Sequence, residues 1–149
     1  LPFALTPPDT TRRIMDVNFM GTFLVTHAAI RLLQKAAEGR IVNFTSVVVP
    51  LRLEGEAAYA AAKSAVEILT RTLAKELGPF GITCNAVGPT PIRTDLIRNV
   101  PEVKLQALIE RQSIQNWAEP VDVTNVVDFF LRPESRLITG QIIYLGGLG

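Results

Sequence analysis

The sequence predicts an α/β fold built on a parallel sheet. Three short apolar segments, at 40–45, 82–87 and 141–145, are rich in β-branched residues and are predicted as strands. Segments with helical periodicity precede and separate them, which is the order expected when crossover connections return the chain to one parallel sheet. The first two strands are predicted to be buried on both faces, because helices cover both sides of such a sheet.

Periodicity and composition predict the two longest helices. Between Thr10 and Ala37 apolar residues recur about every 3.6 positions, and Gly39 is placed to end this helix. The alanine-rich segment 57–77 is a strong helix-forming sequence, and Gly78-Pro79 closes it. Two long helices are therefore expected to flank the first strand.

The remaining segments are shorter. Residues 46–57 are predicted as a loop. The proline-containing segment 88–119 is predicted to leave the sheet, with an amphipathic helix from Val103 to Arg111 inside it. A last helix is predicted over 121–131, opened by Pro120.

Composition excludes several classes of function. The 149 residues suit one domain, and the 15 Lys and Arg are scattered among 14 Asp and Glu, so no surface for nucleic acid or for a membrane is expected. No apolar run approaches the roughly 18 residues that span a bilayer. Hydrophobic residues make up 48% of the chain and charged residues 19%, which is more apolar than a small soluble domain needs and predicts a partner surface.

Neither the single cysteine nor the single histidine is predicted to take part in chemistry. Cys84 lies in a predicted strand and can form no internal disulfide, so a packed thiol in a reducing cytoplasm is expected. His27 has no Asp, Cys or second His at ligand spacing and is predicted to be structural. No metal site is therefore expected.

Three polar residues form the strongest functional pattern. Tyr59 and Lys63 are four positions apart near the start of the predicted helix 57–77, so they share one helix face. Ser46 directly follows a predicted strand, where parallel sheets present functional loops. Singly, Tyr59 and Lys63 could be an exposed amphipathic pair and Ser46 a turn residue. Their combined spacing and context favour a shared site.

The chemistry of these residue types suits reduction of a carbonyl group. Hydride addition to a ketone places negative charge on oxygen, which needs a proton donor and a group that holds it. Tyr59 would act as general acid/base and Ser46 would hold the oxygen. The ammonium of Lys63 is expected to lower the pKa of the Tyr59 phenol towards the working range.

Several motifs together make the chain resemble the short-chain dehydrogenase/reductase family, of the kind that includes the 3-oxoacyl-carrier-protein reductases. The resemblance covers essentially all 149 residues. Its motifs are Asp16-Val-Asn-Phe-Met-Gly21, Gly39-Arg-Ile-Val-Asn-Phe-Thr-Ser46, Tyr59-Ala-Ala-Ala-Lys63, Asn85-Ala-Val-Gly-Pro89 through Thr94-Asp95, and Ile138-Thr-Gly-Gln-Ile-Ile-Tyr-Leu-Gly-Gly147. The resemblance implies a Rossmann-type, doubly wound parallel sheet and an NAD(P)-dependent exchange of hydride with an alcohol or ketone.

The resemblance also implies roles for individual residues. Asn18 matches the family's fourth catalytic residue, which keeps a local opening in its helix and holds a water joining the lysine to solvent. Lys63 and Tyr59 would contact the nicotinamide ribose. The backbone of Ile92, in the loop that starts at Pro89, would bind the carboxamide, and the Thr94 hydroxyl the pyrophosphate. Members carry Pro-Gly in this loop, whereas here Thr90 follows the proline and stiffens it.

Compared with that family, residues 1–149 are expected to be the C-terminal part of one Rossmann-fold domain, with about three strands. No glycine-rich turn that receives a pyrophosphate is present, so the choice between NAD and NADP is open and the 149 residues alone are expected to be inactive. Leu1 is interpreted as an artificial start. The alternative is a non-catalytic remnant that acts as an oligomerisation or scaffold module. Family members are commonly tetramers, which makes a homo-oligomer the expected state.

Overall fold

The computed structural model describes residues 1–36, 38–98 and 100–147, and its centre is a parallel sheet. The strands are β1 (Arg40–Phe44), β2 (Thr83–Gly88) and β3 (Ile142–Tyr144), in the order β1-β2-β3. Ile41 lies beside Cys84, and Ala86 beside Ile142. The three predicted strands are therefore confirmed, with ends that differ by one or two residues.

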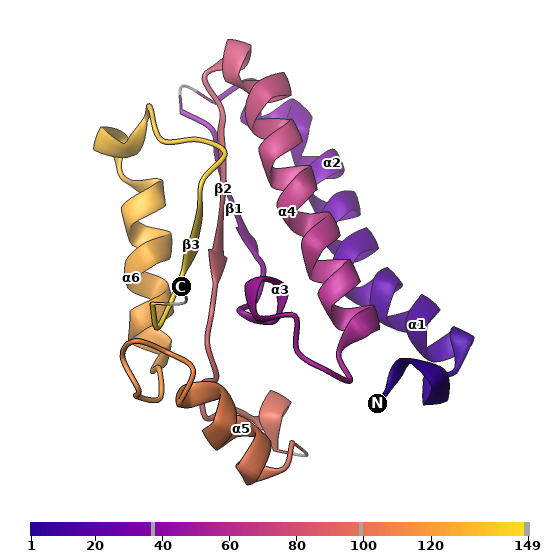
Figure 1. The fold of residues 1–149 in the computed structure, drawn as a ribbon. Helices are drawn as coiled ribbons and strands as arrows, with labels where there is room; N and C mark the ends of the chain where they lie inside the picture. The colour runs from indigo at the N-terminus through magenta and orange to yellow at the C-terminus, as the bar shows by residue number, and fades with distance from the viewer. Residues whose placement is uncertain (37, 99, 148–149) are drawn as a thin grey trace.

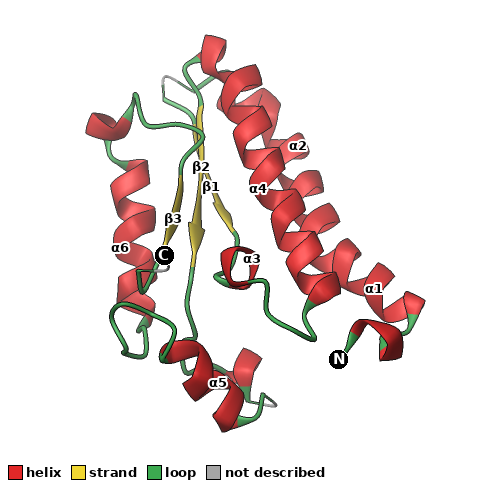
Figure 2. Ribbon diagram, in the orientation of Figure 1, coloured by secondary structure: helices red, strands yellow, loops and turns green. Residues whose placement is uncertain are grey.

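Helices cover both faces of this sheet. The helices α1 (Pro8–Met15), α2 (Gly21–Leu33) and α4 (Ala57–Leu77) lie on one side, and α6 (Pro120–Leu131) lies on the other (Figure 1). The strands run with their carboxyl ends towards α3 (Val48–Leu51) and α5 (Glu102–Ile109), as Figure 2 shows. Short 3-10 turns complete the chain at Phe3–Leu5, Gly78–Phe80, Asp95–Ile97 and Pro133–Ser135.

The first long helix is interrupted. A π-helical segment, Asp16–Met20, separates α1 from α2, and the Gly21 N–H closes it by donating to the carbonyl of Asp16. The helix also ends at Leu33, earlier than predicted, because Ala36 turns back to bond the Leu33 carbonyl at 3.1 Å. The predicted end at Ala37 lies outside the described residues.

Two shorter predictions also needed correction. The segment predicted as a loop contains α3, which starts where the Ser46 hydroxyl oxygen accepts the Val48 N–H at 3.3 Å. The amphipathic helix α5 begins at Glu102 and ends at Ile109, two residues short of the prediction. By contrast, α4 spans the predicted residues, since alanines fill its first turns and Gly78 follows its last residue.

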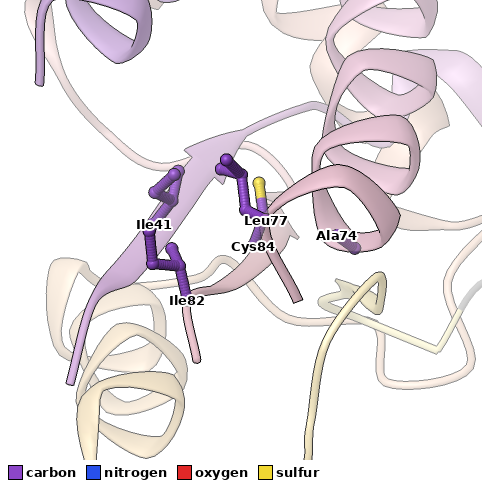
Figure 3. Packing of buried hydrophobic residues seen from close by; sticks show 5 residues of the cluster. All are labelled: Ile41, Ala74, Leu77, Ile82 and Cys84. Carbon is purple, nitrogen blue, oxygen red and sulfur yellow. The ribbon is translucent and has the colours of Figure 1, made fainter. Parts of the chain in front are cut away.

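An apolar cluster joins the C-terminal half of α4 to the sheet. It contains Ile41, Ala74, Leu77, Ile82 and Cys84 (Figure 3). The Cys84 thiol is free and fully buried, and burial raises its pKa to about 12. The predicted role of Cys84 as a packed thiol is confirmed, because almost no reactive thiolate exists near neutral pH.

The two predicted buried strands differ in their surroundings. Every residue of β2 is buried, as predicted. In β1, Ile41 and Asn43 are buried beneath α4, but Phe44 is 48% exposed, so the prediction of burial on both faces is wrong for this strand. Alternate residues of a strand face opposite sides, and the side of β1 opposite α4 is covered only in part by α6.

The last residue of β2, Gly88, has no side chain and so lets Tyr144 and Thr45 approach its Cα closely. A methyl group on its Cα would lie 2.3 Å from Cδ1 of Tyr144 and 3.1 Å from Cγ2 of Thr45. We therefore expect Gly88→Ala to lower the free energy of unfolding by about 1–3 kcal/mol, measured by urea denaturation. Gly78→Ala is the matched control, since a methyl group there meets nothing within 4 Å. Equal stability of the two variants would contradict this packing.

Candidate active site

Ser46 lies immediately beyond the carboxyl end of β1. The preceding Thr45 N–H still belongs to the sheet and donates to the Val87 carbonyl at 2.9 Å. The Ser46 hydroxyl oxygen accepts the Val48 N–H, which fixes the side chain at the start of α3. The proton of the Ser46 hydroxyl therefore stays available to donate to a group beyond the carboxyl end of β1.

Tyr59 and Lys63 occupy the first two turns of α4. The Lys63 ammonium donates to the Phe44 carbonyl at 3.1 Å and lies 5.7 Å from the centre of the Tyr59 ring. The Ser46 side chain lies close enough to Tyr59 to lower the pKa of its phenol. The structure thus brings the three predicted residues together at the carboxyl end of β1.

The protonation of Tyr59 differs from the sequence prediction. Burial raises the pKa of the Tyr59 phenol, the hydrogen bond with Ser46 partly opposes this rise, and the nearby Glu56 carboxylate adds to it. The expected net lowering of this pKa is wrong for this structure, since burial is the largest cause of the shift and the Lys63 ammonium is turned towards the Phe44 carbonyl. At neutral pH Tyr59 is therefore a phenol, the form that donates a proton.

Lys63 is itself partly withdrawn from water. Burial lowers the pKa of the Lys63 ammonium. The group stays close enough to the Tyr59 ring for its charge to favour the phenolate once the phenol has given up its proton. The pair can therefore compensate charge during proton transfer.

Asn18 lies in the middle of the π-helical segment. Its side-chain amide donates to the Ile14 carbonyl at 3.1 Å, and the backbone carbonyl of Asn18 accepts the Thr22 hydroxyl at 3.1 Å. The segment packs against α4, the helix that carries Lys63. The π-helix is a local opening of the kind that the family resemblance implies, while a water relay from Lys63 stays a prediction.

The loop after β2 is held from two sides. The Pro89 carbonyl accepts the Val47 N–H at 3.2 Å, which ties the loop to the Ser46 segment. Ile92 pairs with Ala118 in an isolated parallel bridge. Within the described part of the chain, the Ile92 N–H donates to no backbone acceptor. Thr94, further along, is exposed, so these groups remain available to a ligand.

Two hollows lie near the site, and neither is lined by the predicted catalytic side chains. One of about 670 Å³ borders the N-terminal half of α4 and includes Ser64, Glu67 and Tyr144 in its lining. Another of about 350 Å³ is lined in part by Thr94, by Trp117 and by Leu105 of α5. Among the described residues, Ser46, Tyr59 and Lys63 line neither of these two hollows, and each is partly buried.

The burial of Glu67, an acidic residue near the site, was not predicted from the sequence. Glu67 is only 5% exposed, although it is a carboxylate on a long amphipathic helix. The signal that could have revealed it is its spacing, because Tyr59, Lys63 and Glu67 recur every four residues along one helix face. Its contacts with Thr45 and Tyr144 are described below.

Neither a metal site nor a membrane span emerges from the structure. No three His, Cys, Asp or Glu side chains within residues 1–36, 38–98 and 100–147 come together to hold a metal ion. None of the helices in these ranges is long and apolar enough to cross a membrane.

A parallel sheet with Ser, Tyr and Lys at the carboxyl end of one strand defines the class of dehydrogenases and reductases with a Rossmann-type fold. The family model described as enoyl-(acyl carrier protein) reductase matches residues 1–147. The (3R)-3-hydroxyacyl-CoA dehydrogenase of Homo sapiens is 37% identical over 93% of this chain and 54% of its own length. The chain therefore belongs to the short-chain dehydrogenase/reductase family.

Further relatives agree with this assignment. The 3-oxoacyl-[acyl-carrier-protein] reductase of Rickettsia felis is 31% identical over 91% of this chain and 56% of its own length. A crystal structure of a 3-oxoacyl-[acyl-carrier protein] reductase with bound NAD from Brucella melitensis superimposes with a TM-score of 0.87 at 34% identity, covering 99% of this chain and 55% of that one. The chain thus spans about half the length of these relatives.

Proposed function

We propose that this chain carries the catalytic residues of an NAD(P)-dependent oxidoreductase that interconverts an alcohol and a ketone. The observation that supports the proposal most is the convergence of Ser46, Tyr59 and Lys63 at the carboxyl end of β1. It also follows from this proposal that residues 1–149 form the C-terminal part of one Rossmann-fold domain, as expected from the sequence.

Each residue has a distinct part in reduction. Tyr59, protonated because it is partly buried, gives its proton to the ketone oxygen as negative charge develops there. Ser46 donates a hydrogen bond to the same oxygen and holds it against Tyr59. Lys63 then stabilises the phenolate through its positive charge. Asn18 completes the set by holding a water that returns a proton through Lys63.

The residues present fit a nicotinamide cofactor. The Ile92 N–H is free to donate to the carboxamide, and Thr94 is exposed at the outer end of the loop that begins at Pro89. Lys63 and Tyr59 would contact the ribose. The cofactor, when bound, supplies the hydride, and NAD and NADP both remain candidates.

The substrate class follows from the relatives. Those named above act on 3-hydroxyacyl-CoA or 3-oxoacyl-[acyl-carrier-protein] molecules, so we propose a 3-oxoacyl thioester as the ketone. The test is oxidation of NADH or NADPH by the protein as its gene encodes it, with acetoacetyl-CoA as substrate. Turnover that requires both cofactor and thioester supports the proposal, while no turnover with either cofactor opposes it.

The direction of the Tyr59 shift predicts how activity depends on pH. Because the pKa of Tyr59 lies above its ordinary value, the phenol that reduction needs persists through neutral pH. We expect kcat for reduction to be constant from about pH 6 to 9 and to fall above that range, whereas oxidation, which needs the phenolate, rises towards alkaline pH. Profiles in both directions measure this. A reduction rate that falls between about pH 6 and 8 would contradict the assignment.

A homo-oligomer is proposed from the outer face of the helix pair. Apolar side chains on the π-helical segment, α2 and α4 are exposed in this chain: Val17, Leu24, Val25 and Ile68. A patch of this kind marks an interaction surface, and it is also what a purely scaffolding role would use. Sedimentation of the natural protein tests the oligomer, and an oligomer without turnover would favour the scaffold.

The buried, unpaired Cys84 thiol supports a reducing compartment such as the cytoplasm.

A further inference from the structure

A buried carboxylate lies one helical turn beyond Lys63. One oxygen of Glu67, Oε1, accepts the Thr45 hydroxyl at 2.6 Å and also the Tyr144 hydroxyl. Its other oxygen, Oε2, lies 3.8 Å from a guanidinium nitrogen of Arg71. Glu67 therefore joins α4 to the carboxyl ends of β1 and β3.

This contact is one rung of a series between β1 and α4. Asn43 donates to the Thr70 hydroxyl at 2.9 Å, Thr45 donates to Glu67, and the Phe44 carbonyl accepts Lys63. Asn43 and Thr45, alternate residues of one strand face, thus pair with Thr70 and Glu67 on neighbouring turns of α4, and the Lys63 ammonium binds the backbone between them. Ser46, which lowers the pKa of the Tyr59 phenol, directly follows Thr45 at the end of this series.

We propose that Glu67 is a positioning residue, whose carboxylate fixes Thr45 and thereby aims the Ser46 hydroxyl at Tyr59. The inference rests on the proposed function and deepens it. Thr45 is covalently next to Ser46 and only 3% exposed, so its side chain sets the backbone from which Ser46 projects. A charged acceptor holds a hydroxyl more tightly than a neutral one, which suits a group that must not rotate.

The energetic cost of burying Glu67 and the packing around Thr45 both agree with a positioning role. A buried carboxylate whose nearest cation is 3.8 Å away gains little in stability over an apolar residue of similar size. Tyr144, which shares the same oxygen, has its pKa raised by burial and by Glu67, so it stays a donor. The Tyr144 ring and the Thr45 methyl group both close over Gly88, which keeps Thr45 in place from the other side.

The chain offers a matched pair of variants for the test. Thr45→Val and Thr70→Val each remove one buried hydroxyl that bridges β1 and α4, but only Thr45 adjoins Ser46. In the protein as its gene encodes it, Thr45→Val is expected to lower kcat roughly ten- to a hundredfold with little change in KM, because a small misplacement of a catalytic group is costly. Thr70→Val is expected to change kcat by less than about twofold.

A double-mutant cycle separates positioning from a structural role. If Thr45 acts through Ser46, adding Thr45→Val to Ser46→Ala causes no further loss of kcat. Losses that multiply, or an unchanged kcat in Thr45→Val, would overturn the inference while leaving the proposed function standing. Should Thr45→Val not fold, Glu67→Gln replaces it, with the same coupling to Ser46→Ala expected.

A second readout does not depend on turnover. Tyr59 and Tyr144 are the two tyrosines of the chain, so a Tyr144→Phe background leaves one phenol in these residues to follow by ¹³C-tyrosine NMR. Since the Ser46 hydrogen bond lowers the pKa of Tyr59, Thr45→Val should raise its titration midpoint and Thr70→Val should not. Equal midpoints in the two variants would overturn the inference even if the protein reduces no ketone.

Discussion

Tyr59→Phe is expected to lower kcat for ketone reduction by about 10²–10⁴-fold. The substitution removes the hydroxyl that we propose as the proton donor and changes little volume, so the fold should be preserved. Burial keeps this phenol protonated, and no other hydroxyl in the described site adjoins Lys63 in the same way. Steady-state kinetics with saturating cofactor measure the loss.

Thr72→Val is the matched control for this variant. It removes a hydroxyl from the exposed side of the same helix, and its kcat should equal that of the unmodified protein. Circular dichroism and thermal unfolding check that both variants are folded. Turnover retained by a folded Tyr59→Phe would remove Tyr59 from the mechanism.

Lys63→Ala is expected to have the second largest effect, a fall in kcat/KM for the cofactor of about a hundredfold or more. The substitution removes the charge that we propose to stabilise the Tyr59 phenolate and the donor that would contact the ribose. It also removes the hydrogen bond to the Phe44 carbonyl, which ties α4 to β1. A rise in KM for the cofactor should therefore accompany the fall in kcat.

Lys75→Ala provides the comparison, because Lys75 lies on the same helix and is exposed. Cofactor titration by fluorescence and steady-state kinetics should separate the two variants clearly. If Lys63→Ala and Lys75→Ala had the same kinetics, Lys63 would have no role in binding or proton transfer.

The sequence predicts much of the fold, but not the features set by tertiary packing. The bounds of α4 follow from its alanines and from Gly78-Pro79, which act locally. By contrast, α3 consists of Val-Val-Pro-Leu, a poor helix-forming sequence, and it begins at the hydrogen bond from Val48 to Ser46. The π-helical turn at Asp16–Met20 is a change of hydrogen-bond register that periodicity and propensity do not predict, although the family resemblance implied a local opening at Asn18.

The candidate site was likewise predictable where local geometry decides and not where tertiary packing decides. Spacing correctly brought Ser46, Tyr59 and Lys63 together, because helix and strand geometry fix their directions. The direction in which the Tyr59 pKa moves depends on burial, and the spacing of residues along the sequence does not reveal burial. Glu67 was missed because a carboxylate on an amphipathic helix is normally exposed, and only the partners on β1 and β3 make its burial possible.

Transfer of deuterium tests the central proposal most directly. The protein as its gene encodes it would be incubated with acetoacetyl-CoA and NADH or NADPH carrying deuterium on the transferable position of C4. If the chain belongs to a hydride-transferring oxidoreductase, mass spectrometry finds one deuterium on the carbinol carbon of the product, and Tyr59→Phe makes almost none. An alcohol product without deuterium from either cofactor, or no product at all, would contradict the account.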